Sequence, residues 1–182
     1  MKTETVSPTT MTTAEIRVQR KALYQPKPEP SLWVAVLWPK NGENLGTLLR
    51  TCDAFGAGLV APLGSDATQA LKKGNTIGMG VVPMVRCADP IRYLRHAYDS
   101  GCRMIGLEIA HGSRPLQTFR LDGRKTVLVV GHENRGIPEN AWEFIPEAAE
   151  IEQCGIGNCL NVAVAGSIAL WWLALAGSPD EG

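Results

Sequence analysis

The stretch Ile151-Glu-Gln-Cys-Gly-Ile-Gly-Asn-Cys-Leu-Asn-Val-Ala-Val-Ala165, near the end of the chain, decides the fold. It continues a short apolar strand predicted over residues 148–151, passes through two glycines and enters an apolar helix predicted over residues 160–176. Gly155 and Gly157 let the backbone approach a ligand closely or adopt positive φ. The first N–H groups of the helix that follows have no partner inside it. A strand, a glycine loop and a helix N-terminus in this order predict a small-molecule site.

Strands and helices alternate along the rest of the chain. Apolar, β-favouring runs predict strands over residues 32–37, 58–62, 81–85, 103–107 and 126–130. Amphipathic runs and their end signals predict helices over residues 14–23, 44–55, 67–73, 90–100 and 138–144. This alternation predicts an α/β fold with a mostly parallel sheet flanked by helices. We expect a flexible arm over residues 1–30 and one domain over residues 31–178.

Composition narrows the functional classes. The 182 residues carry 18 basic and 18 acidic side chains, so the chain lacks the strong field of a highly basic nucleic-acid binder, although a local basic patch stays open. The five cysteines show neither a CxxC pair nor zinc spacing, which favours reduced thiols in a cytoplasmic protein and no metal site. The apolar run at the C-terminus is shorter than the ~20 residues of a membrane span.

Two upstream segments carry polar residues that could belong to the same site. In the first, Asn44 stands where a helix is predicted to begin, so its simplest role is an N-cap. Arg50, six residues later, is either functional or a surface arginine paired with Asp53 one turn away.

The second segment is a hydrophobic strand that runs into Gly131-x-Glu133-x-x-Gly136. This pattern places a carboxylate at the carboxyl edge of the sheet, where open α/β sheets bind ligands. The glycines are alternatively plain turn residues, and Glu133 is alternatively solvated or bridged to Arg135. His132 is most simply a loop histidine, because no metal partners lie near it in the sequence.

The closing segment adds two further candidates. Asn161, on the predicted first turn of the last helix, can donate and accept hydrogen bonds at once. Cys159 beside a helix N-terminus is a possible nucleophile. Because no partner base is identifiable, we favour a small packing residue at this position.

In this order the three segments resemble the three motifs of the TrmH (SpoU) branch of the SPOUT superfamily, which are RNA ribose 2′-O-methyltransferases. The resemblance covers roughly residues 32–175. The sequence of these motifs is closest to that of members that methylate guanosine ribose in tRNA. It rests on Asn44…Arg50…Phe55-Gly56, on Gly131-x-Glu133-x-x-Gly136, and on Leu160-Asn161-Val162 after the glycine loop.

The resemblance implies a C-terminal deep trefoil knot that binds S-adenosylmethionine, and a homodimer whose active site lies near the subunit interface. The apolar last helix with Trp171 and Trp172 would suit that interface. RNA is the implied partner, tRNA before rRNA, with no membrane association. The open alternatives are a knotted S-adenosylmethionine- or RNA-binding protein with weak or no catalysis, and an unrelated α/β enzyme that binds NAD or ATP.

The resemblance also assigns site residues by position. Arg50 would sit at the target ribose and phosphate, while Asn44, Glu133 and Asn161 would shape and orient the site. Because arginine is a reluctant base, we expect Arg50 to bind phosphate and stabilise the developing oxyanion. Backbone groups near six residues would hold the cofactor: Leu107, Glu108, Gly131, Ile151, Ile156 and Leu160.

Two features qualify this assignment. Cys159 and Ala163 stand where serines are usual, which weakens or relocates whatever the serine hydroxyls do. The N-terminal arm is either an additional RNA contact or a solvated tail. Its basic residues are Arg17, Arg20, Lys21, Lys27 and, just beyond it, Lys40.

Overall fold

A seven-stranded sheet is the framework of the computed structural model, which describes residues 10–23, 29–64, 68–69, 82–157 and 159–176. The strand order is β3-β2-β1-β6-β4-β7-β5, and every strand pair in it is parallel, which confirms the predicted α/β class. The strands are β1 (Leu32–Val36), β2 (Gly58–Pro62), β3 (Met84–Cys87), β4 (Arg103–Leu107), β5 (Arg114–Pro115), β6 (Thr126–Val130) and β7 (Glu147–Glu150).

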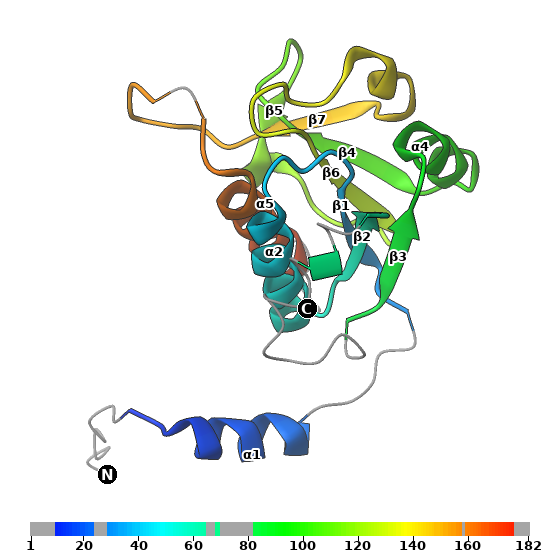
Figure 1. Cartoon of the computed structure of the whole chain (residues 1–182). Coiled ribbons are helices and arrows are strands. Elements are labelled where there is room, and N and C mark those ends of the chain that lie inside the picture. Colours follow the sequence, from blue (N-terminus) through cyan, green and yellow to red (C-terminus); the bar gives the residue numbers. More distant parts are fainter. Residues whose placement is uncertain (1–9, 24–28, 65–67, 70–81, 158, 177–182) are drawn as a thin grey trace.

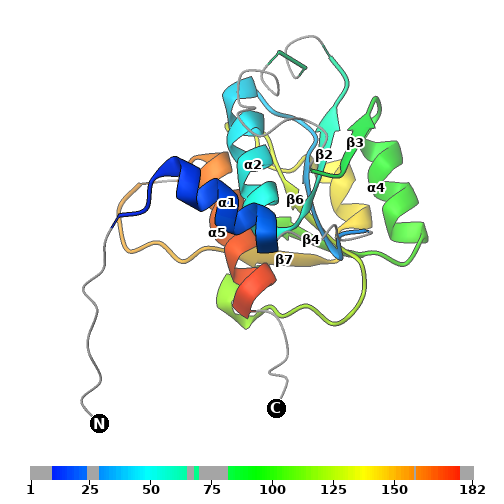
Figure 2. The same cartoon turned by 90° about the horizontal axis from the view of Figure 1, so that it is seen from below.

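Helices cover both faces of the sheet (Figure 1). One face carries α2 (Gly42–Phe55) and α5 (Val162–Trp171), and α5 continues as one π-helical segment, η3 (Trp172–Ala176). The other face carries α4 (Pro90–Asp99) and the 3₁₀ helix η2 (Glu139–Phe144). A second 3₁₀ turn, η1 (Leu116–Thr118), follows β5. The first helix, α1 (Thr13–Leu23), is exposed along its length; it stands apart from the sheet in Figure 1 and is drawn in front of α2 and α5 in Figure 2.

The continuous apolar runs of the central strands follow from this layering. In β1, Val34 and Val36 pack toward α2 and α5, whereas Trp33 and Ala35 pack toward α4 and η2. Because both faces are buried, every position of β1 and β6 is inside the protein. No helix among the described residues is long and apolar enough to cross a membrane.

The start of α2 differs from the prediction. Asn41 is the N-cap, and its side chain accepts a hydrogen bond from the Glu43 N–H at 2.9 Å. The prediction that Asn44 caps this helix was wrong, and Asn44 is instead buried in the first turn of α2. The predicted end is confirmed: Gly56 closes the helix with φ of 64°, a left-handed conformation that favours glycine.

Other boundaries shift by a few residues. Strand β3 begins at Met84, later than predicted, because Pro83 has no N–H to give to a ladder. Helix α5 begins at Val162 because the Asn161 side chain caps it. Most of the helix predicted over residues 67–73 lies outside the described residues. So does the first residue of the strand predicted over residues 81–85. The strand β5 was missed, since two residues carry no periodicity.

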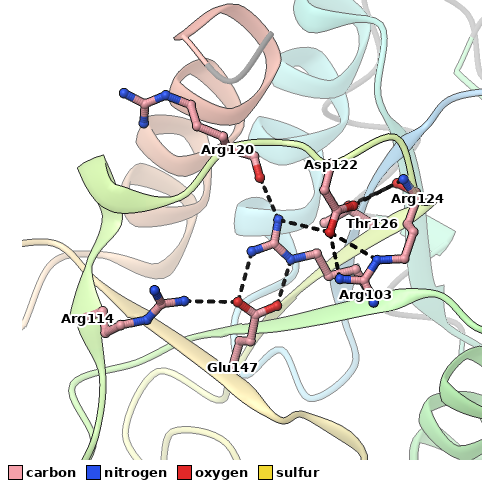
Figure 3. A network of polar contacts seen from close by, with 7 residues as sticks. All are labelled: Arg103, Arg114, Arg120, Asp122, Arg124, Thr126 and Glu147. Atoms are coloured by element: carbon pink, nitrogen blue, oxygen red, sulfur yellow. Dashed lines mark hydrogen bonds and ion pairs between the residues drawn. The ribbon is translucent and has the colours of Figure 1, made fainter. Parts of the chain in front are cut away.

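A network of charged side chains joins the amino ends of β4 and β7 (Figure 3). The Arg103 guanidinium binds Glu147 through two hydrogen bonds, Nε to Oε1 at 2.6 Å and Nη2 to Oε2 at 2.8 Å. Arg114 donates to the same carboxylate at 3.0 Å, and Arg124 binds Asp122 at 2.6 Å. The hydrogen bonds from Arg103 lower the pKa of Glu147, and those from Arg124 lower the pKa of Asp122 to about 2.

This network predicts an acid-sensitive contribution to folding. Because the folded pKa of Glu147 lies below its unfolded value, its contribution is complete above the unfolded pKa and disappears as pH falls through the folded pKa. We expect Glu147→Gln to lose about 2 kcal/mol of unfolding free energy at pH 7, and the difference from the parent to shrink on acidification. Urea titrations across pH measure both, with exposed Glu143→Gln as the control. A deficit that is constant with pH would contradict this prediction.

Candidate cofactor and catalytic site

A cavity of about 540 Å³ opens at the carboxyl ends of β4, β6 and β7. Five of the six residues predicted to hold a cofactor line it: Leu107, Glu108, Gly131, Ile151 and Leu160. The sixth, Ile156, does not line it, because the glycine loop carries this side chain fully into solvent. The cavity therefore joins the ends of three strands to the segment that leads into α5.

Two glycines shape the wall formed by the segment between β6 and η2. A β-carbon at Gly131 would overlap the Gly136 backbone, so the chain can make this close approach only with glycine. Gly136 has φ of 64°, and a β-carbon there would overlap the Glu108 carboxylate. Glu108 in turn accepts the Ile137 N–H at 3.2 Å and the Ile109 N–H at 3.1 Å. These contacts fix the loop against the end of β4.

The three predicted orienting residues meet in one hydrogen-bond chain. The Asn44 Nδ2 donates to Glu133 Oε1 at 2.7 Å, and the Asn161 Nδ2 donates to Asn44 Oδ1 at 3.2 Å. Asn161 Oδ1 accepts the N–H groups of Ala163 at 2.9 Å and Val164 at 3.2 Å, which caps α5. The hydrogen bonds thus connect α2, the loop after β6 and the start of α5. Along the sequence, Glu133 is 89 residues and Asn161 is 117 residues from Asn44.

Glu133 is the fixed charge of this chain. Besides Asn44, it accepts the Lys40 N–H at 2.7 Å and the Asn41 N–H at 3.0 Å. Burial acts to raise the pKa of Glu133, and the hydrogen bonds from these backbone groups and Asn44 together outweigh it, so the net pKa is lowered. The carboxylate is therefore ionised at neutral pH, and it faces α2 rather than Arg135.

Arg50 lies apart from the Asn44–Glu133–Asn161 hydrogen-bond chain. It is exposed on α2 and lines a groove of about 510 Å³ between α2 and α5, together with Phe55, Ser167 and Trp171. No described residue forms an ion pair with it, including Asp53, so the proposed surface pair is not observed. Within one chain the structure does not bring Arg50 together with Asn44, Glu133 and Asn161.

Other sequence interpretations are tested by the same geometry. Cys159 is exposed and lines the cavity, so its interpretation as a packing residue was wrong. Cys154, on the same loop, is also exposed. Trp171 is 49% exposed, whereas Trp172 faces inward and donates to the Phe119 carbonyl at 3.1 Å. Among the described residues, no three His, Cys, Asp or Glu side chains are grouped to hold a metal ion.

Two parts of the site were not identified from the sequence. The backbone N–H groups of Lys40 and Asn41 carry no side-chain signature, so their role toward Glu133 appears only in the fold. Arg135 lines the cavity and was considered only as a partner of Glu133. Its position inside the Gly131-to-Gly136 pattern could have indicated that it lies at the cavity.

Comparison with known proteins adds independent information. The SpoU rRNA Methylase family model matches residues 31–171. The chain is 32% identical over 133 residues to the Mus musculus tRNA (guanosine(18)-2'-O)-methyltransferase TARBP1, covering 70% of this chain and 8% of that protein. It is 32% identical over 145 residues to an uncharacterized tRNA/rRNA methyltransferase of Mycobacterium avium, covering 78% and 46%. The chain therefore spans less than half the length of both relatives.

A solved structure agrees with these relatives. The AdoMet-bound rRNA methyltransferase of Sinorhizobium meliloti superimposes with a TM-score of 0.67 at 26% identity, covering 81% of this chain and 57% of that chain. The match of the family model extends over most of the chain and includes all three segments that build the cavity and the Asn44–Glu133–Asn161 hydrogen-bond chain. The protein belongs to the SpoU rRNA methylase family.

Proposed function

We propose that this protein is an S-adenosylmethionine-dependent RNA methyltransferase that methylates a ribose 2′-hydroxyl. The observation that carries the proposal is the hydrogen-bond chain from Glu133 through Asn44 to Asn161, which assembles residues from three distant segments beside the cavity. The names of the relatives support RNA as the substrate, and the mouse relative supports tRNA and guanosine ribose before rRNA. The cytoplasm is the proposed location.

The cavity fits the cofactor by size and by its backbone. Ligand pockets for such molecules typically enclose roughly 300–1,000 Å³, and this one has about 540 Å³. Gly131 brings the backbone to the wall without a side chain, and the backbone near Leu107, Ile151 and Leu160 completes the surface. The cofactor supplies an activated sulfonium methyl group when bound. We further propose that the chain around residues 151–162 is threaded as a trefoil knot.

The three residues of the hydrogen-bond chain then have distinct roles. Glu133 stays ionised and holds the loop of Lys40 and Asn41, which fixes the start of α2. Asn161 fixes the start of α5, and Asn44 joins the two. Positioning of this kind accounts for a large part of a rate enhancement when the methyl donor is already activated.

A homodimer would complete the site. Helix α5 exposes an apolar stripe at helical spacing, formed by Val164, Ile168 and Trp171 and continued by Leu175 on η3. This stripe borders the groove that holds Arg50. Exposed apolar stripes of this length mark interaction surfaces. A second copy packed on the stripe would enclose Arg50 at the seam, beside the target ribose and phosphate.

The dimer proposal predicts that a charge in the stripe separates the subunits. Because Ile168 is 37% exposed in the isolated chain, Ile168→Glu should not disturb its fold. We expect the variant to sediment as a monomer and to lose methyl transfer, with its melting curve still cooperative. Exposed Val18→Glu on α1 is the matched control and should sediment like the parent. A parent that is monomeric at micromolar concentration would exclude the dimer.

The decisive experiment incubates the protein with methyl-labelled S-adenosylmethionine and unmodified tRNA or rRNA, followed by mapping of ribose methylation. Label on a ribose 2′-oxygen supports the proposal. Cofactor and RNA binding without transfer would instead favour a binding protein, the second candidate, which the exposed Cys159 in place of the usual serine favours. Stabilisation by NAD or ATP alone would refute both.

A further inference from the structure

The rim of the cavity carries one arginine that the rest of the site does not use. Arg135 is the only arginine or lysine among the described residues that line the cavity. No described acceptor lies within hydrogen-bond or ion-pair distance of its guanidinium, which is exposed to solvent. A cationic fork is therefore presented at the opening of the cavity with no internal partner in the described part of the chain.

The carboxylates that could have neutralised Arg135 are engaged elsewhere. Glu133 accepts three hydrogen bonds from the start of α2 and from the turn before it. Glu108 accepts the N–H groups of Ile109 and Ile137, and Glu150 accepts the Ser113 hydroxyl at 2.6 Å. The lining carboxylates thus hold the walls together, which leaves the guanidinium available to a ligand.

The backbone below Arg135 is rigid. The Arg135 N–H donates to the His132 carbonyl at 3.2 Å, the Gly136 N–H donates to the same carbonyl at 2.8 Å, and the Asn134 N–H donates to His132 Nδ1 at 3.0 Å. His132 and Gly136 also form an isolated antiparallel β-bridge. A tight turn of this kind fixes the Cα of Arg135, so only its own side chain must be ordered when a ligand binds.

We propose that Arg135 binds a backbone phosphate of the RNA next to the target nucleotide, with His132 as a second donor. This inference rests on the proposed function. Arginine offers a planar fork that matches phosphate oxygens, and its exposed position suits a polymer that enters from solvent better than a cofactor enclosed by the walls. Because His132 Nδ1 accepts the Asn134 N–H, the other ring nitrogen, Nε2, is the one that carries a proton to donate.

The test measures RNA affinity against salt concentration for the parent, Arg135→Gln and Arg135→Lys, using unmodified tRNA. A phosphate contact predicts that Arg135→Gln weakens RNA binding roughly tenfold and lowers the slope of log affinity against log salt by about 1. Arg135→Lys should keep the slope. S-adenosylmethionine affinity and kcat at saturating RNA should stay at parental values, with the loss confined to KM. Arg92→Gln, an exposed arginine on α4, is the matched control and should change none of these.

Two outcomes would overturn the inference. An unchanged salt slope in Arg135→Gln would show that no phosphate is bound there. A loss of S-adenosylmethionine affinity with RNA affinity intact would assign the guanidinium to the cofactor's carboxylate instead. Either result leaves the proposed function standing if the parent methylates ribose. A parent that transfers no methyl group to any RNA would refute the function itself.

Discussion

Arg50→Lys should lose nearly all methyl transfer while S-adenosylmethionine binding is preserved. Arg50 lies outside the cavity, in the groove between α2 and α5, so the substitution leaves the cavity lining intact. Lysine keeps the charge and loses the planar fork that binds phosphate through two parallel hydrogen bonds. A single-turnover assay with labelled methyl donor, combined with calorimetry of cofactor binding, measures both quantities.

The control for this variant is Arg92→Lys, an exposed arginine on α4, which should transfer methyl groups at the parental rate. Activity of Arg50→Lys within tenfold of the parent would refute the assigned role. An equal loss of cofactor affinity would place Arg50 at the cavity instead of the seam between subunits.

Gly131→Ala should both destabilise the protein and remove cofactor binding. A β-carbon at Gly131 would overlap the Gly136 and Ile137 backbone, which cannot swing aside as a side-chain terminus can. We expect a loss of about 3 kcal/mol of unfolding free energy, which corresponds to roughly 10 °C in Tm for a domain of this size. Thermal melts with and without S-adenosylmethionine test both effects, because cofactor should no longer raise the melting temperature.

Gly157→Ala is the matched stability control, since a β-carbon at Gly157 would meet open space and its φ is not in the left-handed region. Its melting temperature without cofactor should equal that of the parent. A Gly131→Ala protein with the parental melting temperature would mean that the loop after β6 relaxes more freely than its packing indicates.

The fold class was predictable because the central strands are buried on both faces. Strands β2, β4 and β6 occupy the predicted residues, since uninterrupted apolar runs between helices have no other stable arrangement. The ends of helices were less predictable. Asparagine is a favoured cap residue, and in the fold Asn41 caps α2 while Asn44 donates its side-chain N–H to Glu133, 89 residues away.

The site was predictable in its parts and not in its connections. The glycine spacing identified Gly131 and Gly136, and the motif resemblance identified Asn44, Glu133 and Asn161. Sequence could not show that Asn44 joins the other two, because hydrogen-bond partners this far apart depend on how the sheet is ordered. Ile156, which the resemblance assigned to the cofactor through its backbone, is outside the cavity lining, and its side chain is exposed to solvent.

The distribution of thiols offers a practical consequence. Cys52 and Cys87 are buried and Cys102 is half-buried, whereas Cys154 and Cys159 are exposed on the segment between β7 and α5. A maleimide dye added briefly to the native protein should therefore attach at this segment first. Its fluorescence would then follow, in real time, how this stretch of chain responds when small molecules or nucleic acids are mixed with the protein.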